Sequence, residues 1–162
     1  MSQILEEPEV QEVTVRSMRE NDLPEIVKID CLAFGRPRPH FFEVLLMRSL
    51  KVTGLQISLV AELQGRVVGY LVASLYYGEY GIAEPTASID AIGVLPDVRR
   101  KRVGHSLMDQ FKSNAAAVGV TKLRTEVEWD DFDLLGFFAR EGFAPAKRLC
   151  LEVEVDATKP RS

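Results

Sequence analysis

The sequence predicts one mixed α/β domain of the α+β type, with a sheet of about six or seven strands and about four helices on its faces. Strand-like and helix-like patterns alternate along the whole chain. The length of 162 residues suits one domain with a real core, and 46% hydrophobic and 27% charged residues are typical of a soluble globular protein. No repeat, low-complexity block or linker interrupts the chain, so we expect a single domain over residues 12–156 between flexible tails at 1–11 and 157–162.

The N-terminal third predicts one strand and two helices. Residues 12–16 (EVTVR) alternate as a short strand does. Asn21 or Asp22 can cap a helix that has Pro24 in its first turn, and the apolar spacing of residues 25–34 continues that helix. After a proline-broken loop, residues 40–50 predict a second helix.

The middle of the chain predicts a hairpin followed by a strand and a helix. Residues 57–63 and 66–75 read as strands joined at Gln64-Gly65, a good hairpin turn. A strand at 87–94 precedes an amphipathic helix at 103–117, with Leu107, Met108 and Phe111 on one side. The remaining predicted elements are a strand at 122–129, a helix at 133–140 and a last strand at 147–155.

Composition excludes several classes of protein. A net charge of -4 argues against a generally basic surface for nucleic acid. Two cysteines, Cys31 and Cys150, are too few for a secreted disulfide scaffold. The acidic start lacks the basic and apolar regions of a signal peptide, and the most apolar stretch, residues 67–78, is too short to span a bilayer. We therefore expect a cytoplasmic protein.

The most informative segment is DAIGVLPDVRRKRVGHSLM, residues 90–108. Four consecutive cations, Arg99 to Arg102, lie where a strand passes into a helix. A helix start repels cations but attracts anions through its unpaired amides, so the cluster makes sense if an anion such as a pyrophosphate binds there. Gly104 would let the backbone approach it closely. A solvated basic turn and a nucleic-acid patch are the alternatives.

This segment resembles motif A of the GNAT superfamily of acyl-CoA N-acyltransferases. The end of that family's strand is matched by Ile92-Gly93-Val94-Leu95-Pro96, and its turn, Arg/Gln-x-x-Gly-x-Gly/Ala, by Arg99 through Gly104. Residues 133–143 (DLLGFFAREGF) resemble the family's motif B. The resemblance covers about residues 12–155 and implies a GNAT-like, mostly antiparallel central sheet.

The resemblance also implies a function, which is transfer of an acetyl group from acetyl-CoA to a primary amine of a small molecule or protein. Amides of the turn would bind the pyrophosphate, the strand end would pair with the pantetheine like an added strand, and one of its amides would polarise the thioester carbonyl. The implied acetyl-CoA residues are Ile92, Gly93, Val94, Arg99, Arg100, Lys101, Arg102, Val103, Gly104, His105, Ser106 and Asp131.

The reaction needs a neutral amine, so a carboxylate or ordered water must accept a proton. Asp90 on the predicted central strand and Glu126 on TEVEW are the candidates, together with Glu128. The alternative for Asp90 is a structural role, and the alternative for the two glutamates is pairing with Arg124 in solvent. The loop acids Glu79 and Glu84 could also face an amine substrate.

Two positions depart from the family pattern. Arg102 replaces the first glycine of the turn, where it could bind phosphate or obstruct a backbone that needs positive φ. Phe138 stands where many members have a tyrosine proposed as general acid. Water or another tyrosine, Tyr76, Tyr77 or Tyr80, could take over that role. A noncatalytic acyl-CoA-binding or regulatory module on the same fold is therefore the alternative function, and a nucleic-acid binder is a weaker third.

The remaining reactive residues suggest no further chemistry. We expect Cys31 and Cys150 to be buried core thiols rather than nucleophiles. His40 and His105 are too isolated to predict a metal site. The apolar helical set Phe41, Phe42, Leu45 and Leu46 predicts core or a homodimer contact. A homodimer could equally form through an exposed strand edge.

Overall fold

The computed structural model describes residues 12–158, apart from 53–56, 77, 79–80 and 82, as two compact units divided after Glu126. The first unit holds β1 (Val13–Ser17), the 3-10 turn η1 (Glu20–Asp22), α1 (Leu23–Phe34), α2 (Pro39–Val52), β2 (Leu59–Leu63), β3 (Arg66–Tyr76), β4 (Thr86–Val94), the 3-10 helix η3 (Pro96–Lys101), α3 (Val103–Ala117) and β5 (Lys122–Thr125). The second unit holds α4 (Phe132–Arg140). No helix of the described ranges is long and apolar enough to cross a membrane.

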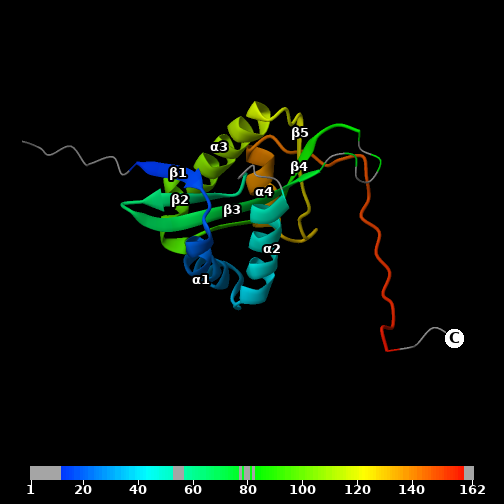
Figure 1. Cartoon of the computed structure of the whole chain (residues 1–162), viewed down its shortest axis with the longest axis horizontal. Coiled ribbons are helices and arrows are strands. Elements are labelled where there is room, and N and C mark those ends of the chain that lie inside the picture. Colours follow the sequence, from blue (N-terminus) through cyan, green and yellow to red (C-terminus); the bar gives the residue numbers. More distant parts are fainter. Residues whose placement is uncertain (1–11, 53–56, 77, 79–80, 82, 159–162) are drawn as a thin grey trace, which may run out of the picture. The chain divides into compact units, whose positions relative to one another are not determined.

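The sheet of the first unit has the order β1-β2-β3-β4-β5, with antiparallel neighbours except for the parallel pair β4 and β5 (Figure 1). This confirms the predicted mostly antiparallel sheet, with five strands in place of six or seven. Gln64 and Gly65 form the predicted hairpin turn, both at positive φ. The strand predicted at 122–129 ends at Thr125.

The prediction of a last strand at residues 147–155 is wrong. These residues adopt no strand and run as an extended segment. A strand exists only where its backbone pairs with a neighbour, and alternation in the sequence cannot show whether a neighbour is present. The prediction therefore failed because it assumed a pairing partner, although the alternation of apolar and polar residues is present in the sequence.

Neighbouring residues of β3 show which helices cover which face of the sheet. A Cβ on Gly69 would contact Val103 and Leu107 of α3. The next residue, Tyr70, faces the other way, bonding to Asp30 of α1 and stacking edge-on with Phe42 of α2. Successive strand residues point to opposite faces, so α3 covers one face and α1 and α2 the other (Figure 1).

Burial follows the predicted helix faces closely. Leu107, Met108 and Phe111 of α3 are fully buried, as is Phe42 of α2. Phe41, one residue away, is 39% exposed, so the apolar set of α2 is only partly core. The side chain of Leu46 lies outside the described residues.

In the second unit, Phe138 packs on α4 between Phe137 and Phe143, with ring centroids 5.3 and 5.0 Å away. The amide of Phe143 donates to the carbonyl of Phe138 at 2.9 Å, which folds the end of α4 back on itself. The prediction of a buried Cys150 is wrong, because it lies on the unpaired segment and is exposed, and Cys31 is half-buried.

A buried ion pair fastens β1 to η1. The carboxylate of Asp22, 5% exposed, accepts two hydrogen bonds from the Arg16 guanidinium at 2.8 Å and one from the Arg19 amide at 2.7 Å. Burial alone would raise the pKa of Asp22, but the bonds from Arg16 and Arg19 outweigh it and hold the pKa below 3.8. Asp22 therefore stabilises the fold above that pH, and this contribution is lost as pH falls through the lowered folded pKa.

We expect Asp22→Asn to lower the free energy of unfolding by about 1.5–3 kcal/mol at pH 7, because an amide cannot accept both arms of the guanidinium as a carboxylate does. The difference from wild type should shrink near pH 3, measured by urea unfolding at both pH values. Asp97→Asn is the control, since Asp97 pairs with Arg66 at 3.3 Å in solvent and such a pair contributes about 0–1 kcal/mol. Equal losses for the two variants would contradict this account.

Candidate active site

The edge of β4 toward β5 opens at its C-terminal end. The last pair of the parallel ladder is Ile89 with Thr125, whose Oγ1 also donates to the Ile89 carbonyl at 3.1 Å. β4 continues to Val94 and there pairs only with β3. In the described first unit, residues 90–94 therefore present a backbone edge with no neighbouring strand on the β5 side.

A β-bulge lies where this open edge begins. Val72 pairs with Ala91 and Ala73 with Ile89, so Asp90 is the extra residue of β4. The Ser74 hydroxyl of β3 donates to Asp90 Oδ2 at 2.5 Å, and Asp90 is half-buried. Bulges often re-aim a side chain beside an active site, and here the residue concerned is the predicted carboxylate.

The open edge leads directly into a basic turn and a helix start. The chain passes from Val94 through η3, whose last turn holds Arg99, Arg100 and Lys101, into α3. Residues 99–102 are exposed, and Gly104 is half-buried. No side chain caps α3, and the Ser106 amide donates to the Arg102 carbonyl at 3.0 Å. The amides that precede Ser106 are those that a helix leaves without an intrahelical acceptor.

Arg102 has the left-handed backbone that a glycine adopts without strain, with φ 59° and ψ 28°. Gln64 is the other non-glycine residue at positive φ in the described ranges. The concern raised by the sequence is thus correct in part: the position does require positive φ, and the arginine adopts it. α3 begins directly after this residue, at Val103.

We expect Arg102→Gly to raise the free energy of unfolding by about 1 kcal/mol, because glycine removes the cost of the left-handed conformation. Arg100→Gly removes the same charge from η3 without relieving positive φ, so it should be neutral or destabilising. Chemical denaturation of both variants beside wild type measures the difference. If the two glycine variants lose equal stability, the strain assigned to Arg102 is absent.

A buried polar network supports β4 from the α1 side. Asp30, fully buried, accepts hydrogen bonds from Arg38 Nε at 3.0 Å, Arg38 Nη2 at 2.7 Å and the Tyr70 hydroxyl at 2.9 Å. The Arg38 guanidinium also lies over the rings of Phe34 and Phe41, 4.8 and 4.6 Å from their centroids. The network joins α1, the start of α2 and β3 beneath the open edge.

The Tyr70 ring lies directly under Gly93. A Cβ at Gly93 would come within 2.6 Å of Tyr70 Cε1, so no larger residue fits without movement. Burial, followed by the charge of Asp30, raises the pKa of Tyr70 far above its usual value of 10.0. Tyr70 is therefore a neutral hydrogen-bond donor that positions β4, and it is unsuited to give up a proton at neutral pH.

We expect Gly93→Ala to lower the free energy of unfolding by about 1–3 kcal/mol, because the added methyl group must displace β4 or the Tyr70 ring. The same substitution in a Tyr70→Ala background should cost little more, since the obstructing ring is gone. A double-mutant cycle from urea unfolding gives this coupling. Additive losses would show that Tyr70 and Gly93 are independent.

The other predicted acids that the structure describes are more exposed than Asp90. Glu126 follows the last residue of β5, with its side chain 73% exposed and 3.8 Å from Arg124. Glu128 is exposed, and Glu84 forms an exposed ion pair with Lys122 at 3.3 Å. Glu126 and Asp90 each directly follow the last pair of the parallel ladder, Thr125 with Ile89, where the two strands part. Glu79, Tyr77 and Tyr80 lie outside the described residues.

Two predicted residues belong to the second unit. Asp131 is the N-cap of α4, and its Oδ1 accepts the Leu134 amide at 3.0 Å. Its contact with acetyl-CoA stays a prediction. Phe138 is 4% exposed, so its ring is part of a small aromatic core. Among the described residues, no group of His, Cys, Asp and Glu could hold a metal ion.

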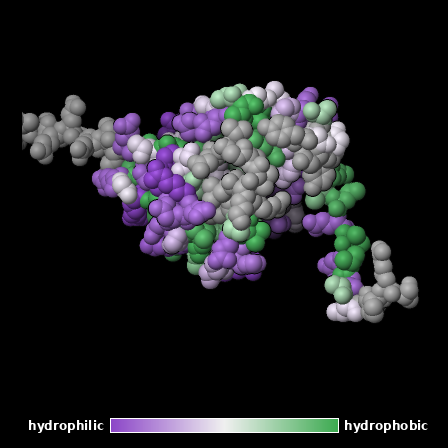
Figure 2. Space-filling model, viewed as in Figure 1, coloured by the Kyte–Doolittle hydropathy of each residue, from purple (hydrophilic) through white to green (hydrophobic). Residues whose placement is uncertain are grey.

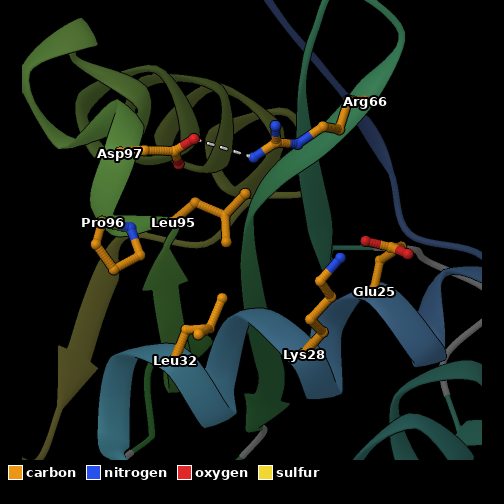
Figure 3. A pocket seen from close by; sticks show the side chains of 7 residues that line it. All are labelled: Glu25, Lys28, Leu32, Arg66, Leu95, Pro96 and Asp97. Carbon is orange, nitrogen blue, oxygen red and sulfur yellow. Dashed lines mark hydrogen bonds and ion pairs between the residues drawn. The ribbon is translucent and has the colours of Figure 1, made fainter.

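A cavity of about 300 Å³ lies on the α1 side of the turn (Figure 3). Figure 3 shows Arg66 of β3 reaching Asp97 of η3 across its rim, with Leu95 and Leu32 facing the space between. Its lining residues are Glu25, Lys28, Leu32, Arg66, Leu95, Pro96 and Asp97. None of them is a predicted site residue, and Leu95 directly follows Val94 at the end of the open edge.

Comparison with known proteins agrees with this geometry. The model of the acetyltransferase (GNAT) family matches residues 23–143. The chain belongs to the GNAT family. It is 26% identical over 144 residues to an N-alpha-acetyltransferase of Sulfurisphaera tokodaii, covering 85% of this chain and 84% of that one. It is 25% identical over 153 residues to an N-alpha-acetyltransferase of Saccharolobus solfataricus, covering 91% and 89%.

A solved structure shows the same fold. The aminoglycoside N-acetyltransferase AAC(6')-Iy in complex with CoA superposes with a TM-score of 0.75 at 17% identity, covering 91% of this chain and 97% of that chain. Family membership and the two relatives together support an acetyl-CoA-dependent N-acetyltransferase.

Sequence reasoning missed four residues of this GNAT site: Ser74, Tyr70, Asp30 and Arg38. Ser74 and Tyr70 interrupt an apolar strand at positions four residues apart, which places both on one face and signals polar contacts there. Asp30 is a charged residue among apolar helix positions, a signal for a buried pair. Their partners could not be chosen without the fold.

Proposed function

We propose that this protein transfers the acetyl group of acetyl-CoA to the α-amino group of a peptide or protein. One observation carries the proposal: the open edge of β4, from Asp90 to Val94, leads through the basic turn η3 into the uncapped start of α3. The edge and the helix start suit the two ends of one ligand, which has an amide-bearing arm and a pyrophosphate.

The residues of the chain fit acetyl-CoA, which supplies the activated acetyl thioester. Backbone groups of Ile92, Gly93 and Val94 can pair with the pantetheine amides as an added strand would. The amides of Val103 through His105 can bind the pyrophosphate, and the cations Arg99 through Arg102 can neutralise it. The cationic cluster at a helix start, unfavourable by itself, is thereby accounted for.

Asp90 is the proposed general base. It is half-buried at the bulge, on the strand that would hold the thioester, and the Ser74 hydroxyl fixes one of its oxygens. The carboxylate accepts the proton lost by the amine, directly or through water, as the nitrogen bonds to the acetyl carbon and the carbon–sulfur bond breaks. Glu126, largely exposed and beside Arg124, is the weaker candidate.

An α-amine suits a site with these groups. Its pKa of about 7.7–8.0 leaves roughly a third of it neutral near pH 7.5, against about one part in a thousand for a lysine side chain of pKa about 10.4. Because much of such an acceptor is already neutral, a carboxylate is a strong enough base for it. The two relatives named N-alpha-acetyltransferase support the same choice.

The site needs no strong general acid. Phe138 cannot donate a proton, and the raised pKa of Tyr70 keeps its proton in place. A thiol pKa of about 8.5 makes the departing sulfur a fair leaving group as thiolate. Water can protonate it after departure.

The proposal further places the protein in the cytoplasm, acting without nucleic acid, membrane or metal. The net charge of -4 and the confinement of the consecutive cations to residues 99–102 support a local anion site over a nucleic-acid surface.

Thiol release from acetyl-CoA with a panel of amines tests the proposal. The panel contains a peptide with a free N-terminus, the same peptide N-acetylated but carrying a lysine, a polyamine and an aminoglycoside. We expect release with the free N-terminus and at least 10-fold less with the others. Preference for the lysine peptide or a small amine would refute the α-amine assignment, and acetyl-CoA binding without release for any amine would favour the noncatalytic module.

A further inference from the structure

Two side chains of β3 hold the open edge of β4 from the same face of the sheet. The Ser74 hydroxyl donates to Asp90 at the bulge, and the Tyr70 ring lies under Gly93, further along β4. Tyr70 and Ser74 are four residues apart in one strand, so both point to the side that α1 and α2 cover. The contact of Ser74 belongs to the proposed base, whereas the contact of Tyr70 has no part in the proton transfer.

Two peptide groups of the open edge meet at the Cα of Gly93. The Leu95 amide donates to the Val68 carbonyl of β3 at 2.9 Å, and Gly93, two residues before Leu95, also pairs with β3. Backbone groups of an antiparallel strand alternate between its two edges, so the Ile92 carbonyl and the Val94 amide point away from β3. They belong to the peptide groups on either side of Gly93. The position of the Gly93 Cα therefore sets the direction of both groups.

The Tyr70 ring is fixed at the end that contacts Gly93. A Cβ on Gly93 would lie 2.6 Å from Tyr70 Cε1 and 2.9 Å from its hydroxyl oxygen. That hydroxyl donates to Asp30 Oδ1 at 2.9 Å, and Tyr70 is fully buried. The hydrogen bond to Asp30 therefore determines where this end of the ring lies against the Gly93 backbone.

Asp30 in turn is held by an arginine. It is fully buried, beneath the mixed hydrophilic and hydrophobic surface that Figure 2 shows in the region of α1 and α2. Arg38 donates to it from Nε at 3.0 Å and from Nη2 at 2.7 Å. The rings of Phe34 and Phe41 lie against the guanidinium and limit its movement. The paired arms of Arg38 give the Asp30 carboxylate a defined orientation toward Tyr70.

We infer that Asp30 is a positioning residue for the binding of acetyl-CoA. It acts through the Tyr70 hydroxyl on Gly93, and so orients the Ile92 carbonyl and the Val94 amide toward the pantetheine. This inference rests on the proposed function, in which the open edge of β4 binds the pantetheine arm.

The two contacts of β3 should affect different kinetic parameters. Binding of acetyl-CoA depends on the direction of the backbone groups beside Gly93, which Asp30 controls. Proton transfer depends on Asp90, which Ser74 holds separately. Loss of the Asp30 network should therefore raise KM for acetyl-CoA, while kcat at saturating acetyl-CoA stays within about threefold of wild type.

Calorimetric titration of acetyl-CoA into the full chain tests the inference. Tyr70→Phe keeps the ring and removes only its hydrogen bond, so Kd should rise about 5-fold or more. Asp30→Asn should raise Kd by about the same factor or more, because an amide cannot accept both arms of Arg38 as the carboxylate does. Kd of the double variant should stay within about twofold of the higher single value, because both substitutions act along one route.

Asp22→Asn is the matched control. Like Asp30, Asp22 is a buried acid that accepts two hydrogen bonds from one arginine, but its bonds go to Arg16 and to the Arg19 amide at the start of α1. Both Asp→Asn variants should unfold at a lower temperature than wild type. Only Asp30→Asn should bind acetyl-CoA more weakly, and Asp22→Asn should keep Kd within about twofold of wild type.

The outcomes separate this inference from the proposed function. An unchanged Kd in Tyr70→Phe and Asp30→Asn, an equal rise in Asp22→Asn, or effects that multiply in the double variant would overturn the inference alone. A wild type that binds acetyl-CoA but releases thiol with no amine would contradict the proposed reaction, and the order of the Kd values would still decide the role of Asp30. A wild type that does not bind acetyl-CoA would overturn both.

Discussion

Replacing Asp90 with asparagine should lower kcat for acetyl transfer by about 10²- to 10⁴-fold, the usual contribution of a general base. The substitution keeps the shape of the side chain and can keep the contact with Ser74, so KM for acetyl-CoA should change little. The loss should be smallest at high pH, where more of the amine is neutral before it binds. Initial rates over a pH series, with the peptide acceptor saturating, measure both effects.

Glu126→Gln is the matched control for this experiment. Glu126 directly follows Thr125 as Asp90 follows Ile89, the last pair of the parallel ladder, but it is 73% exposed and beside Arg124. We expect its kcat to stay within about threefold of wild type. The opposite result, a normal Asp90→Asn and an impaired Glu126→Gln, would move the base to the end of β5.

Replacing Gly104 with aspartate should raise KM for acetyl-CoA by about 100-fold or more. A negative charge in the first turn of α3 would face the pyrophosphate, and like charges brought together cost several kcal/mol. The fold should survive, because aspartate suits a helix start and glycine is a poor helix former. Rates against acetyl-CoA concentration, together with a thermal unfolding curve, separate lost binding from lost structure.

Ser113→Asp introduces the same charge at an exposed position further along α3. Its KM should remain within about twofold of wild type, because the charge is more than two turns from the helix start and is screened. If Gly104→Asp also binds acetyl-CoA normally, the pyrophosphate site is not at the start of α3.

The sequence predicted the parts of the site that are local in the chain. The strand end at Ile92–Val94, the basic turn and the start of α3 follow one another within 15 residues, so their order alone brings them together. The requirement for positive φ at Arg102 was also predictable, because the family motif has glycine there. Local geometry of this kind needs no knowledge of the rest of the fold.

The features that depend on pairing could not be predicted. The bulge at Asp90 and the parting of β4 from β5 after Ile89 arise from the register of strands distant in sequence. The contact of Tyr70 with Gly93 arises in the same way, across neighbouring strands. Hydrophobic alternation fixes which face of a strand is apolar, but it does not show where the ladder stops.

The same limit explains the error over residues 147–155. Their alternation predicts a strand and, with it, a buried Cys150. The structure assigns no strand to these residues, and Cys150 is exposed. Alternation predicts that a segment can form a strand, but it does not identify the strand with which it pairs.

The most direct test of the central claim is a calorimetric titration of acetyl-CoA into the wild-type protein. The site built from the open edge of β4 and the start of α3 predicts one binding event per chain with a micromolar Kd, about -8 kcal/mol. A folded protein that gives no binding heat with acetyl-CoA at millimolar concentration, and no rise in its unfolding temperature, would contradict the account.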